Sequence, residues 1–167
     1  MADFNISVRA GTRTALVYES SGVIYMTRGD LKNALLFLNK AISLDPEKGR
    51  AYYNRAMVFD MMNMKEESIK DYNSALEFSP EMTLEVLSNR SVLLLETGRF
   101  ADAINDLDRL IALNRNEYMY FYNRAFARLK LNNIDGAIED YQKALQLNPG
   151  DQLTRNQLQI LMNNRIR

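Results

Sequence analysis

The sequence contains neither cysteine nor histidine. Without cysteine the chain has no disulfide, no thiolate ligand for a metal and no cysteine nucleophile. Without histidine it also lacks the side chain that most often serves as a general base and as a metal ligand. The few glycines do not form a loop of the kind that cradles phosphate. The composition therefore predicts a protein that is not an enzyme, with no metal and no cofactor.

Charge of one sign is not in excess, because 21 basic residues balance 21 acidic residues among the 167. Such a balance gives no general attraction to nucleic acid or to anionic lipid. No apolar run approaches the roughly 18 residues that span a bilayer, and the first residues lack the apolar core of a signal peptide. We therefore expect no nucleic-acid partner and no membrane insertion. The compartment is not identified, although these absences favour the cytoplasm.

What the chain does contain is an internal repeat. A triplet of Asn, Arg and a small residue lies inside an apolar run three times, at Asn54-Arg55-Ala56, Asn89-Arg90-Ser91 and Asn123-Arg124-Ala125. The spacings are 35 and 34 residues. A fixed period of this length is typical of a solenoid of stacked structural repeats.

Apolar residues recur every three or four positions around each triplet, which predicts amphipathic helices. Proline occurs only three times, and each proline ends one of these helical stretches. The pattern predicts an all-α chain of four helical hairpins at residues 13–46, 47–80, 81–115 and 116–149, followed by a last helix at 150–167. Residues 1–12 have no clear period, and we expect them to form a frayed or loosely docked leader.

These hairpins resemble the tetratricopeptide repeat (TPR) family, whose 34-residue pattern has bulky residues at positions 4, 11 and 24, small residues at 8, 20 and 27, and proline at 32. The second hairpin carries the pattern as Tyr52, Ala56, Phe59, Ser68, Tyr72, Ala75 and Pro80. The third is the most degenerate, with Leu110 for alanine and Arg115 for proline. In the fourth, Arg128 replaces the aromatic residue at position 11. We expect its stem to cover the core while its charged head stays in water.

The resemblance implies a TPR solenoid of four helix–turn–helix repeats, wound as a right-handed superhelix, with a C-terminal capping helix. One hairpin cannot bury its own apolar face, whereas a stack of four can. The resemblance also implies a non-enzymatic module whose first helices line a concave groove. That groove would bind a peptide segment of a partner protein. The alternative is a scaffold that associates with copies of itself through its end helices or its groove.

Two sets of residues fall on the implied groove. One is the asparagine at position 6 of three successive repeats, at Asn54, Asn89 and Asn123. A carboxamide both donates to and accepts from a peptide backbone, so this row resembles an asparagine ladder that holds an extended chain. The alternative is that these amides are satisfied by their own helices or by water.

The other set is apolar and comprises Tyr53, Met57, Met61, Val92, Tyr122 and Phe126. Methionine adapts its shape and tyrosine offers a rigid body with a polar tip, and both are common at binding surfaces. An exposed patch of this kind marks an interaction site. The alternative is that the C-terminal helix folds back and covers it.

Two other interpretations are weaker. The arginines Arg55, Arg90 and Arg124 suggest an anion site, but in the family their position lies towards the neighbouring helix, which favours a structural role. Family members that clamp a C-terminal carboxylate use lysine and asparagine at defined groove positions. Here those positions hold Glu19 and Val23 in one window and Tyr53 and Met57 in the next. The sequence therefore favours an internal or apolar peptide segment as the ligand.

Overall fold

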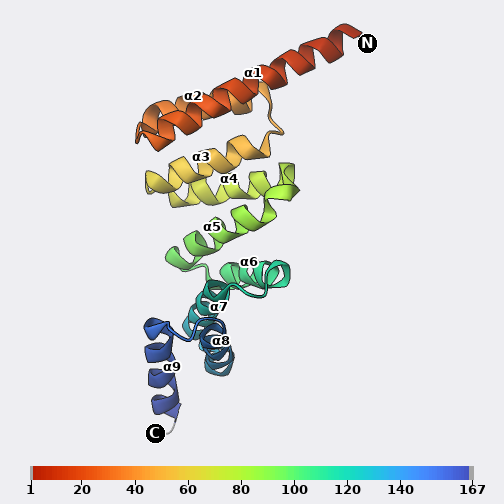
Figure 1. Ribbon diagram of the computed structural model, residues 1–167. Helices are drawn as coiled ribbons and strands as arrows, with labels where there is room; N and C mark the ends of the chain where they lie inside the picture. The colour runs from red at the N-terminus through yellow and green to blue at the C-terminus, as the bar shows by residue number, and fades with distance from the viewer. Residues whose placement is uncertain (1, 166–167) are drawn as a thin grey trace. The chain divides into compact units, whose positions relative to one another are not determined.

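The structure is a computed structural model that describes the backbone of residues 2–165 and the side chains of residues 14–163. In the described part of the chain, all regular elements are helices (Figure 1). The chain divides into two compact units, residues 1–86 and residues 87–167. Each unit is described by itself.

The first unit consists of two hairpins. Helices α1 (Ala2–Thr27) and α2 (Leu31–Leu44) form one, and α3 (Gly49–Met61) and α4 (Lys65–Phe78) form the other. Helix α3 packs mainly on α2 and more lightly on α1, so the second hairpin stacks on the first. A short 3-10 turn, η1 (Pro80–Met82), follows α4 and leads into α5 (Thr83–Glu96), which begins in this unit.

The second unit contains the rest of α5, then α6 (Phe100–Leu113), α7 (Tyr118–Lys130), α8 (Ile134–Leu147) and α9 (Gln152–Arg165). Helices α7 and α8 form a hairpin, with α7 packed on the preceding α6 and α9 packed on α8. The all-α fold built from helix–turn–helix hairpins that the sequence predicts is confirmed.

Residues 2–12 of the expected leader lie within the described backbone. Its backbone belongs to α1, which begins at Ala2 and continues without a break to Thr27. The side chains of residues 1–13 lie outside the described part of the chain. The expectation that this leader is frayed or loosely docked therefore stays a prediction.

The turn inside every hairpin uses the left-handed backbone region. Gly29 and Gly98 have φ of 76°, and Asn63 and Asn132 have φ of 59° and 61°. These four residues lie 34, 35 and 34 positions apart. Glycine adopts this conformation without steric cost, and asparagine tolerates it better than most residues. The repeat is therefore visible in the backbone of the turns as well as in the core.

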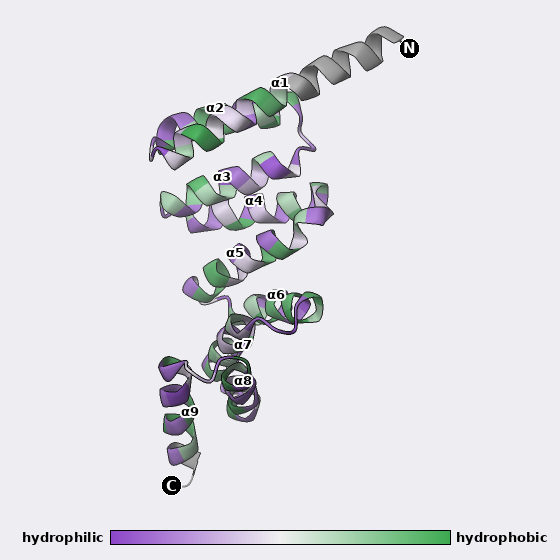
Figure 2. Ribbon diagram, viewed as in Figure 1, coloured by the Kyte–Doolittle hydropathy of each residue, from purple (hydrophilic) through white to green (hydrophobic). Residues whose placement is uncertain are grey.

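Small residues let the two helices of each hairpin approach closely. Ala34, Ala56, Ala75, Ala125 and Ala137 are all fully buried. Bulky residues then fill the space between the helices, as Leu38, Tyr72, Leu107 and Tyr141 do at 0–2% exposure. Figure 2 shows hydrophobic and hydrophilic residues on the same helices, as expected where each helix buries one face.

The first hairpin adds an aromatic cluster. The ring of Phe37 on α2 stacks on Tyr25 of α1 at 5.1 Å between centroids and lies 5.9 Å from Tyr18. Such ring pairs add about 1 kcal/mol beyond the area that they bury. In the described residues, no helix is long and apolar enough to cross a membrane.

Gly22 lies at a close contact between α1 and α2. A Cβ atom at this position would lie 2.6 Å from Cγ of Leu38 and 3.3 Å from the carbonyl oxygen of Ala34. We expect Gly22→Ala to destabilise the protein by about 1–3 kcal/mol, because overpacking a tight core forces its neighbours to move. Urea denaturation followed by circular dichroism measures the change.

The matched control is Gly150→Ala. A Cβ atom there meets only Oδ1 of Asn148, at an ordinary contact distance of 3.6 Å. Its free energy of unfolding should stay within about 0.5 kcal/mol of that of the wild type. An equal loss in both variants would show that the α1–α2 contact is not the cause.

Candidate functional site

An ion pair of the same geometry joins the two helices in the second, third and fourth hairpins. An arginine of the first helix donates from Nε and Nη2 to both carboxylate oxygens of an aspartate 16 residues later. The pairs are Arg55–Asp71 at 2.6 and 2.8 Å, Arg90–Asp106 at 2.8 and 2.6 Å, and Arg124–Asp140 at 2.9 and 2.7 Å. The aspartates are only 3–6% exposed. Two-pronged contacts of this kind are the strongest that arginine makes with a carboxylate.

The third nitrogen of two of these arginines reaches the preceding hairpin. Nη1 of Arg55 donates to Oδ1 of Asn39 on α2 at 2.7 Å, and Nη1 of Arg124 donates to Oδ1 of Asp108 on α6 at 2.6 Å. Burial lowers the pKa of Arg124, but its hydrogen bonds to Asp140 and Asp108 outweigh burial and raise that pKa overall. The positive charges of these arginines are therefore neutralised by carboxylates within the protein. Their contacts favour the structural role over the anion site.

Arg128 differs from the sequence-based expectation. Its Nη1 lies 2.9 Å from Oδ2 of Asp140 and donates to the carbonyl oxygen of Gly136 at 3.1 Å. The guanidinium head is therefore held by Asp140 beside Arg124 and does not stand free in water. The expectation was wrong because the sequence alone did not show that the aspartate of the neighbouring ion pair lies within reach.

The three asparagines at equivalent positions have different surroundings. Asn54 on α3 is 8% exposed, and its Nδ2 donates to Oε1 of Glu19 on α1 at 3.3 Å. Glu19 is also buried, and its Oε2 lies 3.2 Å from Nζ of Lys48. Asn89 on α5 is exposed, and Asn123 on α7 is half-buried. The row is therefore not uniform, and one of its members is anchored inside the first unit.

In the first unit the apolar candidates are partly covered. Tyr53 packs its ring 6.0 Å from that of Tyr72, and Met57 packs against the cluster formed by Met26, Leu38 and Val58. Both side chains remain half-buried. They contribute to the core and also keep part of their surface on the first helix of the second hairpin.

In the second unit a more open apolar surface follows α5 and α7. Val92 is 44% exposed. Phe126 is half-buried, with its ring 6.2 Å from Phe100 and under the ammonium group of Lys130 at 5.3 Å. Tyr122 packs at the edge of the cluster around Tyr141. One residue outside the candidate list, Met119, is 40% exposed on α7 and belongs to the same surface.

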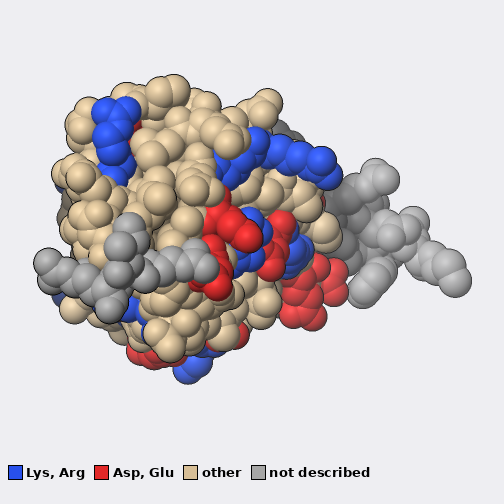
Figure 3. Space-filling model, turned by 90° about the horizontal axis from the view of Figure 1, so that it is seen from below, with Lys and Arg blue, Asp and Glu red and all other residues tan. Residues whose placement is uncertain are grey.

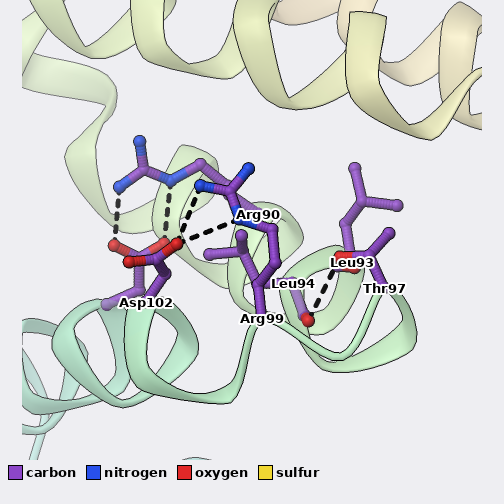
Figure 4. A network of polar contacts seen from close by, with 7 residues as sticks. Arg90, Leu93, Leu94, Thr97, Arg99 and Asp102 are labelled. Carbon is purple, nitrogen blue, oxygen red and sulfur yellow. Dashed lines mark hydrogen bonds and ion pairs between the residues drawn. The ribbon is translucent and has the colours of Figure 1, made fainter.

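Helices α5 and α7 are linked directly, since the hydroxyl groups of Ser88 and Tyr120 lie 3.3 Å apart. The turn between α5 and α6 is closed by its own contacts (Figure 4). There Arg99 donates to Asp102, and the Thr97 hydroxyl donates back to the carbonyl oxygen of Leu93 at 2.9 Å. First helices of successive hairpins thus lie side by side in this unit.

Charge does not gather into a patch of one sign on the face that Figure 3 shows. Acidic and basic groups lie next to one another there, and most of the surface carries neither. Among the described residues, no group of three or more acidic side chains is arranged to hold a metal ion. The arrangement offers carboxamides and apolar side chains, which suit binding rather than proton or group transfer.

Sequence models described as tetratricopeptide repeat match residues 15–48, 49–82 and 118–151. Together they cover more than half of the 167 residues and leave between them residues 83–117, the region of the most degenerate repeat. Each match begins two residues after the boundary that we expect from the sequence.

Several proteins are similar to this chain in sequence. A TPR repeat-containing protein of Methanocaldococcus jannaschii is 29% identical over 157 residues, which cover 89% of this chain and 28% of the relative. RNA polymerase II-associated protein 3 of Xenopus laevis is 30% identical over 118 residues, 71% of this chain and 18% of the relative. Photosystem I assembly protein Ycf3 of Prochlorococcus marinus is 27% identical, over 84% of this chain and 71% of the relative. The chain thus spans less than a third of the first two relatives.

Solved structures share the fold. YrrB, described as a TPR protein with an unusual peptide-binding site, superposes with a TM-score of 0.83 at 19% identity over 97% of this chain and 83% of its own. MamA of Desulfovibrio magneticus gives 0.82 at 16% identity over 91% and 85%. At these identities the likeness concerns the fold alone.

Asp140 tests the structural role of the ion pairs. Asp140→Ala leaves the partly buried Arg124 and Arg128 without their shared carboxylate, and we expect a loss of about 3 kcal/mol or more in the free energy of unfolding. The control is Asp102→Ala, because the Arg99–Asp102 pair is exposed and should contribute about 0–1 kcal/mol. Thermal or urea denaturation compares them, and similar small losses in both would contradict a structural role.

Tyr141 gives a prediction for alkaline pH. Burial, with a smaller effect of Tyr122, raises the pKa of Tyr141 to about 12, whereas a tyrosine in an unfolded chain ionises near 10. The neutral phenol is thus favoured in the folded state. Its contribution, of order 2 kcal/mol, is present below pH ~10 and is lost as the pH rises towards ~12.

Urea midpoints measured across this pH range test that prediction. Other tyrosines and lysines also titrate there, so the comparison is between the wild type and Tyr141→Phe, which lacks the ionisable group. We expect the difference in stability between the two proteins to change with pH in favour of the variant. Parallel pH profiles would show that Tyr141 does not carry this dependence.

Proposed function

Because the chain belongs to the tetratricopeptide repeat family, we propose that it is a non-enzymatic protein–protein interaction module that binds a peptide segment of a partner protein along the first helices of its hairpins. The observation that carries this proposal is a pair of side chains that recurs on α5 and α7. A carboxamide is followed three residues later by an apolar residue, as Asn89 and Val92, and as Asn123 and Phe126. Residues three apart on a helix are surface neighbours.

Each member of the pair has a chemical task. The carboxamides of Asn89 and Asn123 donate to and accept from the backbone of an extended peptide. Val92 and Phe126, with Tyr122 beside them, receive apolar side chains of the same peptide. The hydroxyl contact between Ser88 and Tyr120 holds α5 and α7 together. The two pairs therefore face a single ligand in this unit.

In the first unit we assign the corresponding role to Asn54, Tyr53 and Met57. The bond from Nδ2 of Asn54 to Glu19 fixes the orientation of its carboxamide. The half-buried side chains of Tyr53 and Met57, with Met61 on the same helix at 57% exposure, offer apolar surface to the peptide.

Two further points support a peptide as the ligand. YrrB, which shares the fold, is described as having an unusual peptide-binding site. The lysine and asparagine of a carboxylate clamp are missing where the family places them, since Glu19 and Tyr53 stand at the lysine position and Val23 and Met57 at the asparagine position. We infer that the segment is internal and largely uncharged rather than a chain terminus.

The test uses a peptide selected from a displayed library of random 12-residue sequences on the wild-type chain. We expect the double variant Asn89→Ala, Asn123→Ala to weaken binding of this peptide at least tenfold, since each lost hydrogen-bonding group costs about 1 kcal/mol. The control is Asn105→Ala, an exposed asparagine on the second helix α6. Fluorescence anisotropy measures the affinities, and an unchanged affinity of the double variant would refute the proposal.

One observation favours the second candidate, a scaffold that associates with copies of itself. Val17 and Ile24 on α1 are 62% and 49% exposed, although the residues 34 positions later, Ala51 and Val58 on α3, are fully buried. The positions through which α3 stacks on the first hairpin are thus exposed to solvent on α1. One relative of the chain is also described as a photosystem I assembly protein.

Sedimentation equilibrium tests this candidate. If α1 mediates association, the mass of the wild type rises with concentration, and the double variant Val17→Lys, Ile24→Lys stays monomeric, because buried charges oppose association. The control is Leu36→Lys, equally exposed on α2. A monomeric wild type at every concentration would exclude self-association.

A further inference from the structure

Helix α9 follows the register of the first helices. Leu93 on α5, Ala127 on α7 and Leu161 on α9 lie 34 residues apart and are 2%, 0% and 9% exposed. The residues immediately before these three also lie 34 positions apart. Each of them is more exposed to solvent than the residue that follows it. Val92 is 44% exposed, Phe126 is half-buried and Ile160 is 53% exposed. Buried and exposed positions of α9 thus repeat those of α5 and α7.

The packing of α9 agrees with this register. Leu161 lies in the cluster of Ala125, Ala137, Ile138 and Tyr141, which belongs to the α7–α8 hairpin. Leu158 packs at the edge of the same cluster. Thr154, seven residues before Leu161, is fully buried. Helix α9 therefore packs as the first helix of a fifth repeat would. This contact determines which of its faces stay exposed.

The two side-chain types of the proposed binding surface also continue onto α9. The carboxamides of Asn89 and Asn123 are followed at the same interval by Gln157. The exposed Met119 on α7 is followed by Leu153 on α9, at 40% and 54% exposure. Gln157 precedes Ile160 by three residues, as Asn89 precedes Val92 and Asn123 precedes Phe126. The same pair of a carboxamide and an apolar residue thus stands on three helices.

We propose that α9 is the third helix of the peptide-binding surface in residues 87–167, with Gln157 binding the peptide backbone and Ile160 and Leu153 binding apolar side chains. This inference rests on the proposed function. It assigns binding residues to a helix that a solenoid otherwise needs only to cover its end. Packed helices lie about 8–10 Å apart, so three of them span roughly 20 Å, about six residues of extended peptide.

The charges along this surface define the ligand further. On α9 the neighbours of Gln157 and Ile160 are uncharged, namely Asn156 and Asn163, whereas α5 carries the exposed Glu85 and α7 carries the exposed Lys130. Arg155 on α9 points towards the turn before this helix, where it donates to the carbonyl oxygen of Pro149. Because the surface carries one charge of each sign and is uncharged on α9, the complementary ligand is an extended, largely uncharged segment of a partner protein with apolar residues over α9.

The experiment uses the peptide selected on the wild-type chain from the displayed 12-residue library. Gln157→Ala and Ile160→Ser change the proposed contacts, and Gln159→Ala and Met162→Ser are the controls on the same helix. Met162 is 47% exposed, close to the 53% of Ile160. We expect each of the first two variants to weaken binding about fivefold or more, and each control to stay within about twofold. Circular dichroism checks that all four variants keep the fold.

The outcomes separate this inference from the proposed function. If Gln157→Ala and Ile160→Ser bind as the wild type does while Asn89→Ala, Asn123→Ala binds weakly, α9 is only a cap and the inference is wrong. If neither set weakens binding, the proposed function fails as well. An equal loss in Gln159→Ala and Met162→Ser would also contradict the inference, because it would place the effect outside the described register.

Discussion

The bidentate ion pair between the two helices of a hairpin is the interaction on which the rest of the structure depends. It connects residues 16 positions apart in three successive hairpins, as in Arg124–Asp140. Because both groups are largely buried, the geometry tolerates little sliding of one helix along the other. The first hairpin has Ser21 and Phe37 at these two positions, and there the ring of Phe37 on Tyr25 replaces the charge contact. In the first hairpin, ring stacking therefore keeps the two helices aligned in place of an ion pair.

Once the helices are aligned, the exposure of each first-helix residue follows from its register. Residues at the register of Val58, Ala127 and Leu161 are buried, and the residue before each keeps part of its surface open. A sequence with a 34-residue period therefore presents the same side chains at regular intervals without any special local structure. In the second unit this produces the carboxamides and apolar residues on which the proposed function rests. The proposed function therefore depends on the side chains that the core leaves exposed.

Most of the fold could be predicted from the sequence, since small residues such as Ala56 and Ala125 and the bulky Tyr72 mark the close contacts directly. Three features could not. The carboxamide of Asn54 is held by Glu19, which lies 35 residues away, and the head of Arg128 is held by Asp140, and neither partner lies within the local pattern of the residue it holds. The sequence of helix α9 indicates only a polar capping helix, and it is the burial of Leu161 in the structure that shows its register.

Two-dimensional NMR of the isotope-labelled chain, titrated with the selected peptide, tests the central claim that ligands bind along the first helices. The side-chain amide signals of Asn89 and Asn123 report on α5 and α7, and those of Asn105 and Gln142 report on the second helices α6 and α8. We expect the first pair to shift in proportion to bound peptide while the second pair stays in place. Shifts confined to Asn105 and Gln142 would place the ligand on the opposite side of the hairpins and contradict the account.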